Sequence, residues 1–352
     1  MTSIGLIVNP RAGRDIRRLV GLASVHNNHE KVDTVRRVLS GAAAVGVETA
    51  VLVPDLTGIA TTAAARAPDG IKIRWAMIER HGTAQDSSAG AAAVCDAGVS
   101  AVVSLGGDGT QRAVAAGCGQ IPIVAVSTGT NNVIPTLVDG TMAGVAAGLL
   151  ATGAVSVAQV THRAKRVELQ LDGTEDFALV DAAVCRDPFV GSRAIWRTDQ
   201  ARTVVLARAD PWAMGLSSIG GRLCPTSASC DAGLLVELGH GTPVLAAVAP
   251  GRVLPVGVRS WRQLALGEEV SLPVGAETIA LDGEREIAVA EHVSQGAVLR
   301  ARVTRNGPLI VDIHAALDAW PATALPQEHH EDGIRRPHRQ GPGEGSVKPA
   351  GR

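Results

Sequence analysis

Short apolar runs alternate with helix-like segments through the first part of the chain. The apolar runs that predict strands are Ile4–Val8, Thr49–Val53, Ile71–Trp75, Ala101–Leu105 and Ile121–Val126. Between them, Glu30–Leu39 has its apolar residues on one helical face, and Thr83 can cap a second helix that ends before Gly98. Strands that alternate with helices are typical of a parallel sheet covered by helices, so residues 1–160 are predicted to form a Rossmann-like α/β domain.

After residue 160 the pattern changes to shorter apolar runs separated by Gly, Pro and Asp turns. These runs are Arg166–Leu171, Ala178–Val184, Thr203–Ala207, Leu234–Leu238 and Thr278–Ala280. They predict a β-rich second domain over residues 161–320, whose final segment is expected to pack back on the first domain. Residues 321–352 are polar and rich in Pro and Gly without apolar periodicity, so we expect a disordered tail.

One segment, Gly140–Thr161, has 22 residues without a charged side chain and has to be weighed as a membrane span. Its four glycines and dispersed Thr, Ser and Gln favour a buried helix that runs into a strand. The N-terminus lacks a basic stretch followed by a long apolar run. The five cysteines form an odd set without a CxxC pair or a metal-binding spacing, which indicates reduced core thiols. We therefore expect a cytoplasmic protein with no membrane span.

Charge and aromatic content argue against several classes of partner. Lys and Arg number 33 and Asp and Glu 34, which gives a net charge of −1, so no overall basic field favours nucleic acid or an anionic membrane. With five Trp, two Phe and no Tyr, the stacking platforms of single-strand binders are nearly absent. Any polyanion must bind locally, and the expected partners are small molecules.

A glycine-rich turn, GGDGT, follows the strand predicted at Ala101–Leu105. It comprises Gly106, Gly107, Asp108, Gly109 and Thr110. Glycines let backbone N–H groups approach an anion, and the helix that begins near Thr110 adds its positive dipole end, so phosphate is the expected ligand. A carboxylate inside a phosphate cradle is unfavourable unless a metal ion or a proton transfer offsets it, so Asp108 indicates phosphoryl transfer. The alternative is an ordinary turn with a solvated Asp108.

Two further loops follow predicted strands in the same half of the chain. The first, NPRAGR, contributes the candidate phosphate ligands Asn9, Arg11, Gly13 and Arg14. The second, STGTNN, contributes the candidate nucleotide ligands Thr128, Gly129, Thr130, Asn131 and Asn132. Because ligand loops gather at the carboxyl ends of strands, we expect both loops to lie beside the GGDGT turn. The alternatives are a solvated helix face for the arginines and a helix cap for one of the asparagines.

Three familiar motifs are missing from the sequence. The chain has four lysines and no Gly-Lys pair, so it lacks the GxxxxGK[ST] phosphate loop. Arg112 stands where GxGxxG needs its third glycine, and Ile219 interrupts the GxSxG-like segment GLSSIGG. These absences exclude a P-loop protein, the usual dinucleotide fingerprint and the hydrolase nucleophile elbow.

The loops NPRAG, GGDGT and TGTNN, in this order, resemble those of the NAD kinase and diacylglycerol-kinase-like superfamily. The likeness is greatest to its acetoin-catabolism protein X branch, an ATP-NAD kinase-like family, and it covers residues 3–315. ALDGERE, at residues 280–286, is similar to the late DGE turn of the lipid-kinase relatives. The resemblance implies an α/β domain followed by a β-sandwich domain. We also expect a homo-oligomer.

The resemblance also implies roles for individual residues. Asp108 would deprotonate or orient the acceptor hydroxyl, with the glycine turn around the nucleotide phosphates. Asp181 falls near the position where NAD kinases hold the acceptor ribose. Asp282 and Glu284, in the DGE turn, would coordinate Mg²⁺ through water. The implied cofactors are Mg²⁺ and ATP, the latter as the phosphoryl donor.

The implied reaction is ATP-dependent phosphoryl transfer to a hydroxyl group. The leading acceptor is the 2′-hydroxyl of NAD or NADH, with a link to acetoin catabolism. The tyrosine-containing acceptor segment of NAD kinases has no counterpart, since the chain contains no Tyr. Two alternatives therefore stay open: a lipid or other small-molecule hydroxyl kinase, and a non-catalytic nucleotide-binding regulatory module. Polyphosphate also stays open as the donor.

Overall fold

The computed structural model describes residues 2–13, 22, 26–129, 132–186, 200–275, 277–288 and 298–320. Its helices are α1 (Asn28–Ala44), α2 (Ile59–Ala64), α3 (Ala84–Asp96), α4 (Asp108–Gly117), α5 (Gly140–Thr152), α6 (Val157–Val160), α7 (Leu216–Leu223) and α8 (Ile313–Asp318). Its strands are β1 (Ser3–Val8), β2 (Thr49–Leu52), β3 (Lys72–Trp75), β4 (Ala101–Gly106), β5 (Ile123–Ser127), β6 (Thr161–Arg163), β7 (Arg166–Leu171), β8 (Thr174–Ala178), β9 (Asp181–Cys185), β10 (Ala201–Leu206), β11 (Ala232–Ala249), β12 (Arg252–Ala265), β13 (Glu269–Pro273), β14 (Thr278–Leu281), β15 (Glu284–Ala288), β16 (Val298–Thr304) and β17 (Leu309–Val311). The tail predicted at 321–352 lies outside the described residues.

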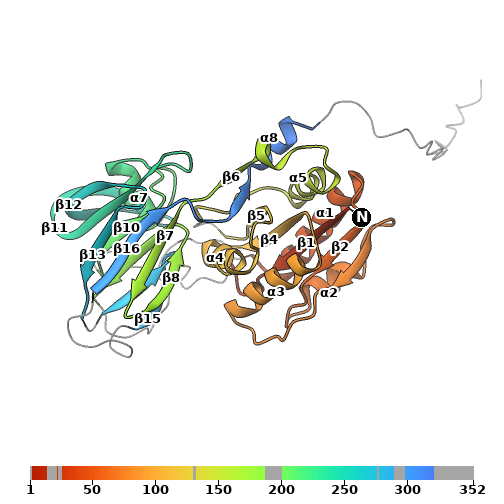
Figure 1. Ribbon diagram of the computed structural model, residues 1–352, viewed down its shortest axis with the longest axis horizontal. Helices are drawn as coiled ribbons and strands as arrows, with labels where there is room; N and C mark the ends of the chain where they lie inside the picture. Colours follow the sequence, from red (N-terminus) through yellow and green to blue (C-terminus); the bar gives the residue numbers. More distant parts are fainter. Residues whose placement is uncertain are drawn as a thin grey trace, which may run out of the picture. The chain divides into compact units, whose positions relative to one another are not determined.

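The first sheet has the strand order β3-β2-β1-β4-β5-β17-β6 (Figure 1). Strands β1 to β5 run parallel, and Ile4 of β1 lies opposite Ala50 of β2 on one side and Ala101 of β4 on the other. The chain thus moves outward from β1 to β3 and then crosses to the other side of β1. Such a reversal of strand order opens a crevice at the carboxyl ends of the strands, where α/β proteins bind ligands.

Helices cover both faces of this sheet. Ile4 and Leu6 of β1 join the core beneath α1, α2 and α5, whereas Ile7 joins the core beneath α3 and α4. The strands predicted in this half all form, and α3 begins after its predicted cap, Thr83. The α/β prediction for the first half is confirmed. It could be made from the sequence because the spacing of apolar residues separates strands from helices there.

The charge-free segment Gly140–Thr161 forms α5, α6 and β6. Helix α5 packs closely on α1. The contact is so close that a Cβ on Gly144 would collide with the Val38 carbonyl, and a Cβ on Gly41 would collide with the Thr141 carbonyl. The glycines of this segment therefore allow contact between two helix backbones. Among the described residues, no helix has the length and apolar character needed to span a membrane.

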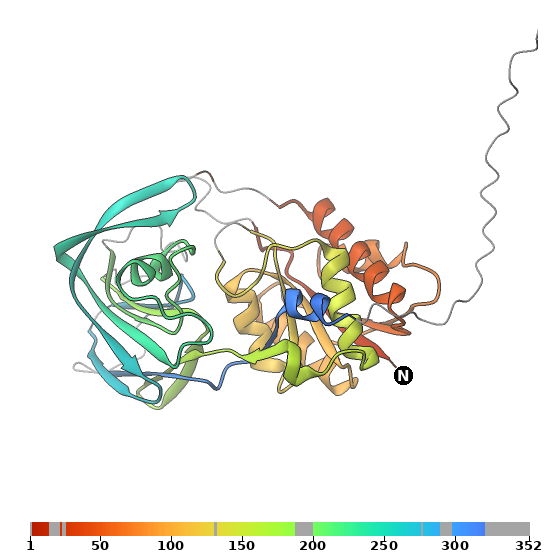
Figure 2. The same ribbon diagram turned by 90° about the horizontal axis from the view of Figure 1, so that it is seen from above.

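The second half consists of two antiparallel sheets. Their strand orders are β12-β11-β10-β9-β14-β15 and β13-β16-β7-β8. Val205 of the first and Leu299 of the second belong to one shared core, while α7 covers the other face of the six-stranded sheet through Leu216. Figure 2 shows β11 and β12 as a long hairpin. The prediction of a β-rich sandwich for the second half is confirmed.

The chain passes between the two halves twice, once before the second half and once after it. The first crossing passes through Lys165, a fully buried residue that donates to the Ala232 carbonyl at 2.6 Å. Burial lowers the pKa of Lys165 to about 8. After β16 the chain returns to β17, which pairs with β5 and β6, and α8 then places Ile313 and Ala316 in the first core. The last described segment therefore completes the α/β half.

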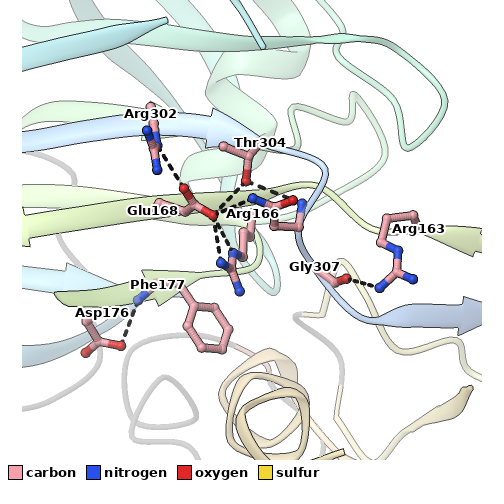
Figure 3. A network of polar contacts seen from close by, with 9 residues as sticks. Arg163, Arg166, Glu168, Asp176, Phe177, Arg302, Thr304 and Gly307 are labelled. Atoms are coloured by element: carbon pink, nitrogen blue, oxygen red, sulfur yellow. Dashed lines mark hydrogen bonds and ion pairs between the residues drawn. The ribbon is translucent and has the colours of Figure 1, made fainter. Parts of the chain in front are cut away.

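A network of polar contacts centred on Glu168 joins β7 to β16 (Figure 3). The donors to its carboxylate are Asn306 at 2.9 Å, Arg166 at 2.6 Å, Arg302 at 2.8 Å and Thr304 at 3.1 Å. Burial by itself would raise the pKa of Glu168, but these hydrogen bonds outweigh burial and lower it to about 2. The Arg166 guanidinium also lies over the Phe177 ring, 5.1 Å from its centre.

Candidate active site

Three loops meet where the strand order of the first sheet reverses. They follow β1, β4 and β5, which run parallel and so end at the same edge. Asn9, directly after β1, donates its N–H to the Leu105 carbonyl at 3.0 Å and its side-chain amide to the Thr110 hydroxyl at 2.8 Å. Gly13 has φ +74° and lies so close to the Thr128 carbonyl that a Cβ would collide with it. The loops that the sequence predicts to gather do lie together.

A lysine of α1 donates hydrogen bonds to the loop after β1. Lys31 is 1% exposed and donates to the carbonyls of Asn9, Pro10 and Ala12 at 3.2, 2.8 and 2.7 Å. Lys31 is not among the predicted site residues. A signal was present, because Lys31 precedes Val35 by one helical turn and so stands on the apolar face of the predicted helix.

The GGDGT turn leads directly into α4. Gly107 is the N-cap of this helix and has no side chain with which to cover the first N–H groups. A Cβ on Gly106 would collide with the Thr110 side chain, and one on Gly107 would lie 2.8 Å from Oδ1 of Asn132. A Cβ on Gly109 would meet no atom of the described residues within 4 Å. Packing explains the first two glycines, whereas the space beside Gly109 suits a ligand.

Asp108 is the first residue of α4 and is buried. Its carboxylate accepts the N–H of Val133 at 2.9 and 3.1 Å and the N–H of Ile134 at 2.8 Å. Both amides belong to the segment after β5, so Asp108 holds the third loop against the glycine turn. In that loop the Thr128 hydroxyl is buried, and it has no hydrogen-bond partner among the described residues.

Asp282 lies in the turn between β14 and β15, with its backbone at φ +52°. Its Oδ1 accepts the N–H groups of Leu179 and Val180 at 2.9 and 2.7 Å, and its Oδ2 is 3.6 Å from Nε of Arg112. Burial raises the pKa of Asp282 well above its ordinary value; the Arg112 guanidinium opposes this shift, and the Asp181 carboxylate adds to it. Asp282 is therefore surrounded by protein groups.

Arg112 connects α4 with the second half of the chain. It lies one helical turn after Asp108, and its Nη1 is 3.3 Å from Oδ1 of Asp176 on β8. Its Nε faces Asp282, whose own N–H donates to the Asp181 carbonyl at 2.9 Å. Arg112 thus connects the helix that begins at Asp108 with the DGE residue Asp282.

The predicted Mg²⁺ ligands do not form a metal site by themselves. In the described part of the chain, no three His, Cys, Asp or Glu side chains are grouped to hold a metal ion. Asp282 has two amides at one oxygen and a guanidinium near the other, and Glu284, the first residue of β15, is half-buried. A divalent cation would need most of its oxygen ligands from elsewhere, such as a bound phosphate chain.

The other predicted ligands have mixed placements. Arg11 is exposed, and its backbone N–H donates to Oδ1 of Asn9 at 2.9 Å. In the third loop the Ser127 hydroxyl donates to the Gly129 carbonyl at 2.8 Å and accepts from Nδ2 of Asn132 at 2.7 Å. The predicted ligands that lie outside the described residues are Arg14, Thr130 and Asn131.

Two family models match the chain, one in each half. The ATP-NAD kinase N-terminal domain matches residues 4–154, and the acetoin catabolism protein X C-terminal domain matches residues 165–302. A relative, acetoin catabolism protein X from Cupriavidus necator, is 38% identical over 301 residues, which cover 81% of this chain and 84% of the relative. The chain belongs to the acetoin catabolism protein X family. This confirms the resemblance carried by the three loops and gives the chain an NAD kinase-like fold.

The two matched regions of this acetoin catabolism protein X family member meet at the site. The first contains the NPRAG and GGDGT loops, and the second contains the DGE turn. The contact between Arg112 and Asp282 joins them directly. The two regions therefore share one charged cluster.

Proposed function

We propose that this protein is an ATP-dependent kinase that phosphorylates a hydroxyl group, with the 2′-hydroxyl of NAD or NADH as its first acceptor. The observation that carries the proposal is the meeting of three strand-end loops around the N-terminus of α4, at the point where the strand order reverses. A glycine turn, a helix N-terminus and the loop after β1 together suit a chain of phosphates.

The residues of this site divide the work between donor and acceptor. Arg11 and the N–H groups of Gly109 and Thr110 would hold the donor phosphates. Asp108, buried at the start of α4, would orient the acceptor hydroxyl or take its proton. Asp181, near Asp282, would contact the acceptor ribose. Each role rests on the family resemblance and on the position of the residue in the strand-end loops or beside Asp282.

Mg²⁺ is proposed to enter with the nucleotide, since the Asp282 carboxylate already contacts two amides and a guanidinium. When bound to the phosphate chain, Mg²⁺ neutralises negative charge there. The coordination predicted for Asp282 and Glu284 stays a prediction. Its test is whether replacing both residues raises the Mg²⁺ concentration needed for half-maximal activity.

The names of the matching models and relative support the choice of substrates. One model is that of an ATP-NAD kinase domain, and the relative is named for acetoin catabolism, so we place the NADP(H) formed here in that process. A homo-oligomer and a cytoplasmic location are part of the same proposal.

The test is a product assay on the purified full-length protein. Mg-ATP, or polyphosphate as an alternative donor, is incubated with NAD, NADH, diacylglycerol and sugars, and the masses of the products are measured. Addition of one phosphate to NAD or NADH supports the proposal. If only a lipid or a sugar gains a phosphate, that compound replaces NAD or NADH as the acceptor. If ATP binds and no compound gains a phosphate, the regulatory module takes the place of the kinase.

A further inference from the structure

Lys31 makes an unusual set of contacts beneath the loop after β1. Its ammonium donates to three main-chain carbonyls of that loop, those of Asn9, Pro10 and Ala12. An ammonium group has three protons to donate, and here three acceptors come from one turn of chain. Helix α1 places the lysine firmly, because its first turn is closed by a capping box between Asn27 and Glu30.

Burying a charged side chain is costly unless the surrounding groups replace water. Lys31 is 1% exposed and stands at a position of α1 where its neighbours in the helix, Val32 and Val35, are core residues. An apolar side chain would suit this face for stability alone. A lysine that donates to three loop carbonyls therefore indicates that the loop needs this conformation.

The contacts determine which way the loop peptides face. The C=O of Ala12 and the N–H of Gly13 belong to one trans peptide and point in opposite directions, so drawing the carbonyl toward Lys31 turns the Gly13 N–H away from it. Gly13, at φ +74°, lies against the Thr128 carbonyl of the third loop. Lys31 thus orients the peptide between Ala12 and Gly13 and leaves the Gly13 N–H directed away from the lysine.

We infer that Lys31 is a positioning residue for the polyphosphate chain of a nucleotide. Its ammonium sets the conformation of residues 9–13 through three main-chain carbonyls, without touching the ligand. The inference rests on the proposed function, in which this loop binds donor phosphates. The ligand class is a nucleoside triphosphate, and inorganic tripolyphosphate shares its recognised part.

The experiment compares Lys31→Met with Lys165→Met in the full-length protein. Both variants remove a buried ammonium that donates to main-chain carbonyls, but Lys165 lies at the crossing to the second half. Lys72→Met, on the exposed strand β3, is a second control. Calorimetric titration measures the Kd of ATP and of tripolyphosphate for each protein, after thermal unfolding has shown that it is folded.

Lys31→Met is expected to raise the Kd of ATP and of tripolyphosphate by about tenfold or more, because a charge and three loop contacts are lost. Lys165→Met and Lys72→Met are expected to stay within about twofold of the parent, a difference well under 1 kcal/mol. In the kinase assay Lys31→Met should raise KM for ATP more than it lowers kcat, as loss of uniform binding does. If Lys31→Met does not fold, Lys31→Gln, which keeps an amide donor but not the charge, takes its place.

Two results would overturn the inference. One is equal weakening by the Lys31 and Lys165 variants, and the other is unchanged binding in the Lys31 variant. A parent protein that binds both ligands but transfers no phosphate contradicts the kinase and leaves the Lys31 comparison to be decided by Kd alone. A parent protein that binds neither ATP nor tripolyphosphate removes both proposals.

Discussion

The GGDGT and DGE turns each bury an aspartate that accepts the N–H groups of two consecutive residues. Asp108 accepts those of Val133 and Ile134, and Asp282 accepts those of Leu179 and Val180, whose two N–H groups meet at one oxygen. The device is the same, since a carboxylate that accepts tandem amides fixes a neighbouring segment.

The two turns differ in what surrounds the aspartate. Asp108 begins a helix and is followed by Gly109, beside which there is open space. Asp282 has a left-handed backbone, its side chain is fully buried, and its second oxygen faces Arg112. An Asp-Gly turn can therefore either face the open space of a site or support a neighbouring segment, depending on the residues around it.

The largest effect should come from Asp108→Asn in the first turn. An amide cannot take a proton from the acceptor hydroxyl, so kcat is expected to fall by about 10² to 10⁴. Asp86→Asn is the matched control, because Asp86 also accepts two consecutive amides, those of His81 and Gly82, outside the loops of the site. Steady-state kinetics measures both variants. A rate above about a tenth of the parent's for Asp108→Asn removes its catalytic role.

In the second turn, loss of the partner of Asp282 should lower the stability of the protein. Arg112→Leu leaves the buried Asp282 carboxylate without its guanidinium and is expected to lower the free energy of unfolding by roughly 3 kcal/mol. The double variant with Asp282→Asn should lose less than the two single losses together, since the charge is then gone. Arg36→Leu, which breaks a partly exposed pair with Asp33, is the control and should cost less than about 1 kcal/mol. Additive losses in urea unfolding would show that Arg112 and Asp282 act independently.

Much of this comparison could be predicted from the sequence, because the information is local. Strand spacing and glycine content place the GGDGT turn at a strand end, and the order of the three loops identifies the family. The partners of Asp282 could not be predicted, because Leu179, Val180 and Arg112 come from distant parts of the chain. Arg112, in the sequence, only marks the absence of GxGxxG.

Lys31 illustrates another limit. Its position on an apolar helical face is visible in the sequence, but its acceptors are main-chain carbonyls. Their direction depends on how residues 9–13 fold over α1, and nothing in side-chain identity encodes that. The same holds for Gly109, which the sequence groups with Gly106 and Gly107, although only the structure separates glycines that packing requires from one that faces open space.

The glycines that follow the two aspartates should also differ in their effects. Gly283 has φ +76°, so Gly283→Ala should cost about 1 kcal/mol of unfolding free energy. Gly109 lies in α4, so Gly109→Ala should be neutral or stabilise the protein by up to about 1 kcal/mol while raising KM for ATP. Thermal unfolding and ATP kinetics of both variants check this. Unchanged KM in Gly109→Ala would mean that the space beside it does not face the donor.

The smallest effect tests whether a carboxylate held by polar and charged side chains behaves differently from the two held by main-chain amides. The pKa of Glu168 is lowered to about 2 against an ordinary value of 4.5, so its stabilisation is present above about pH 5 and is lost as the pH falls toward 2. Because half of the Arg302 side chain is exposed, we expect only about 1 kcal/mol. Glu168→Gln should therefore be less stable than the parent at pH 7, with a difference that shrinks on acidification. Urea unfolding between pH 7 and pH 3 measures it, and a difference that stays constant with pH would assign the loss to packing instead of charge.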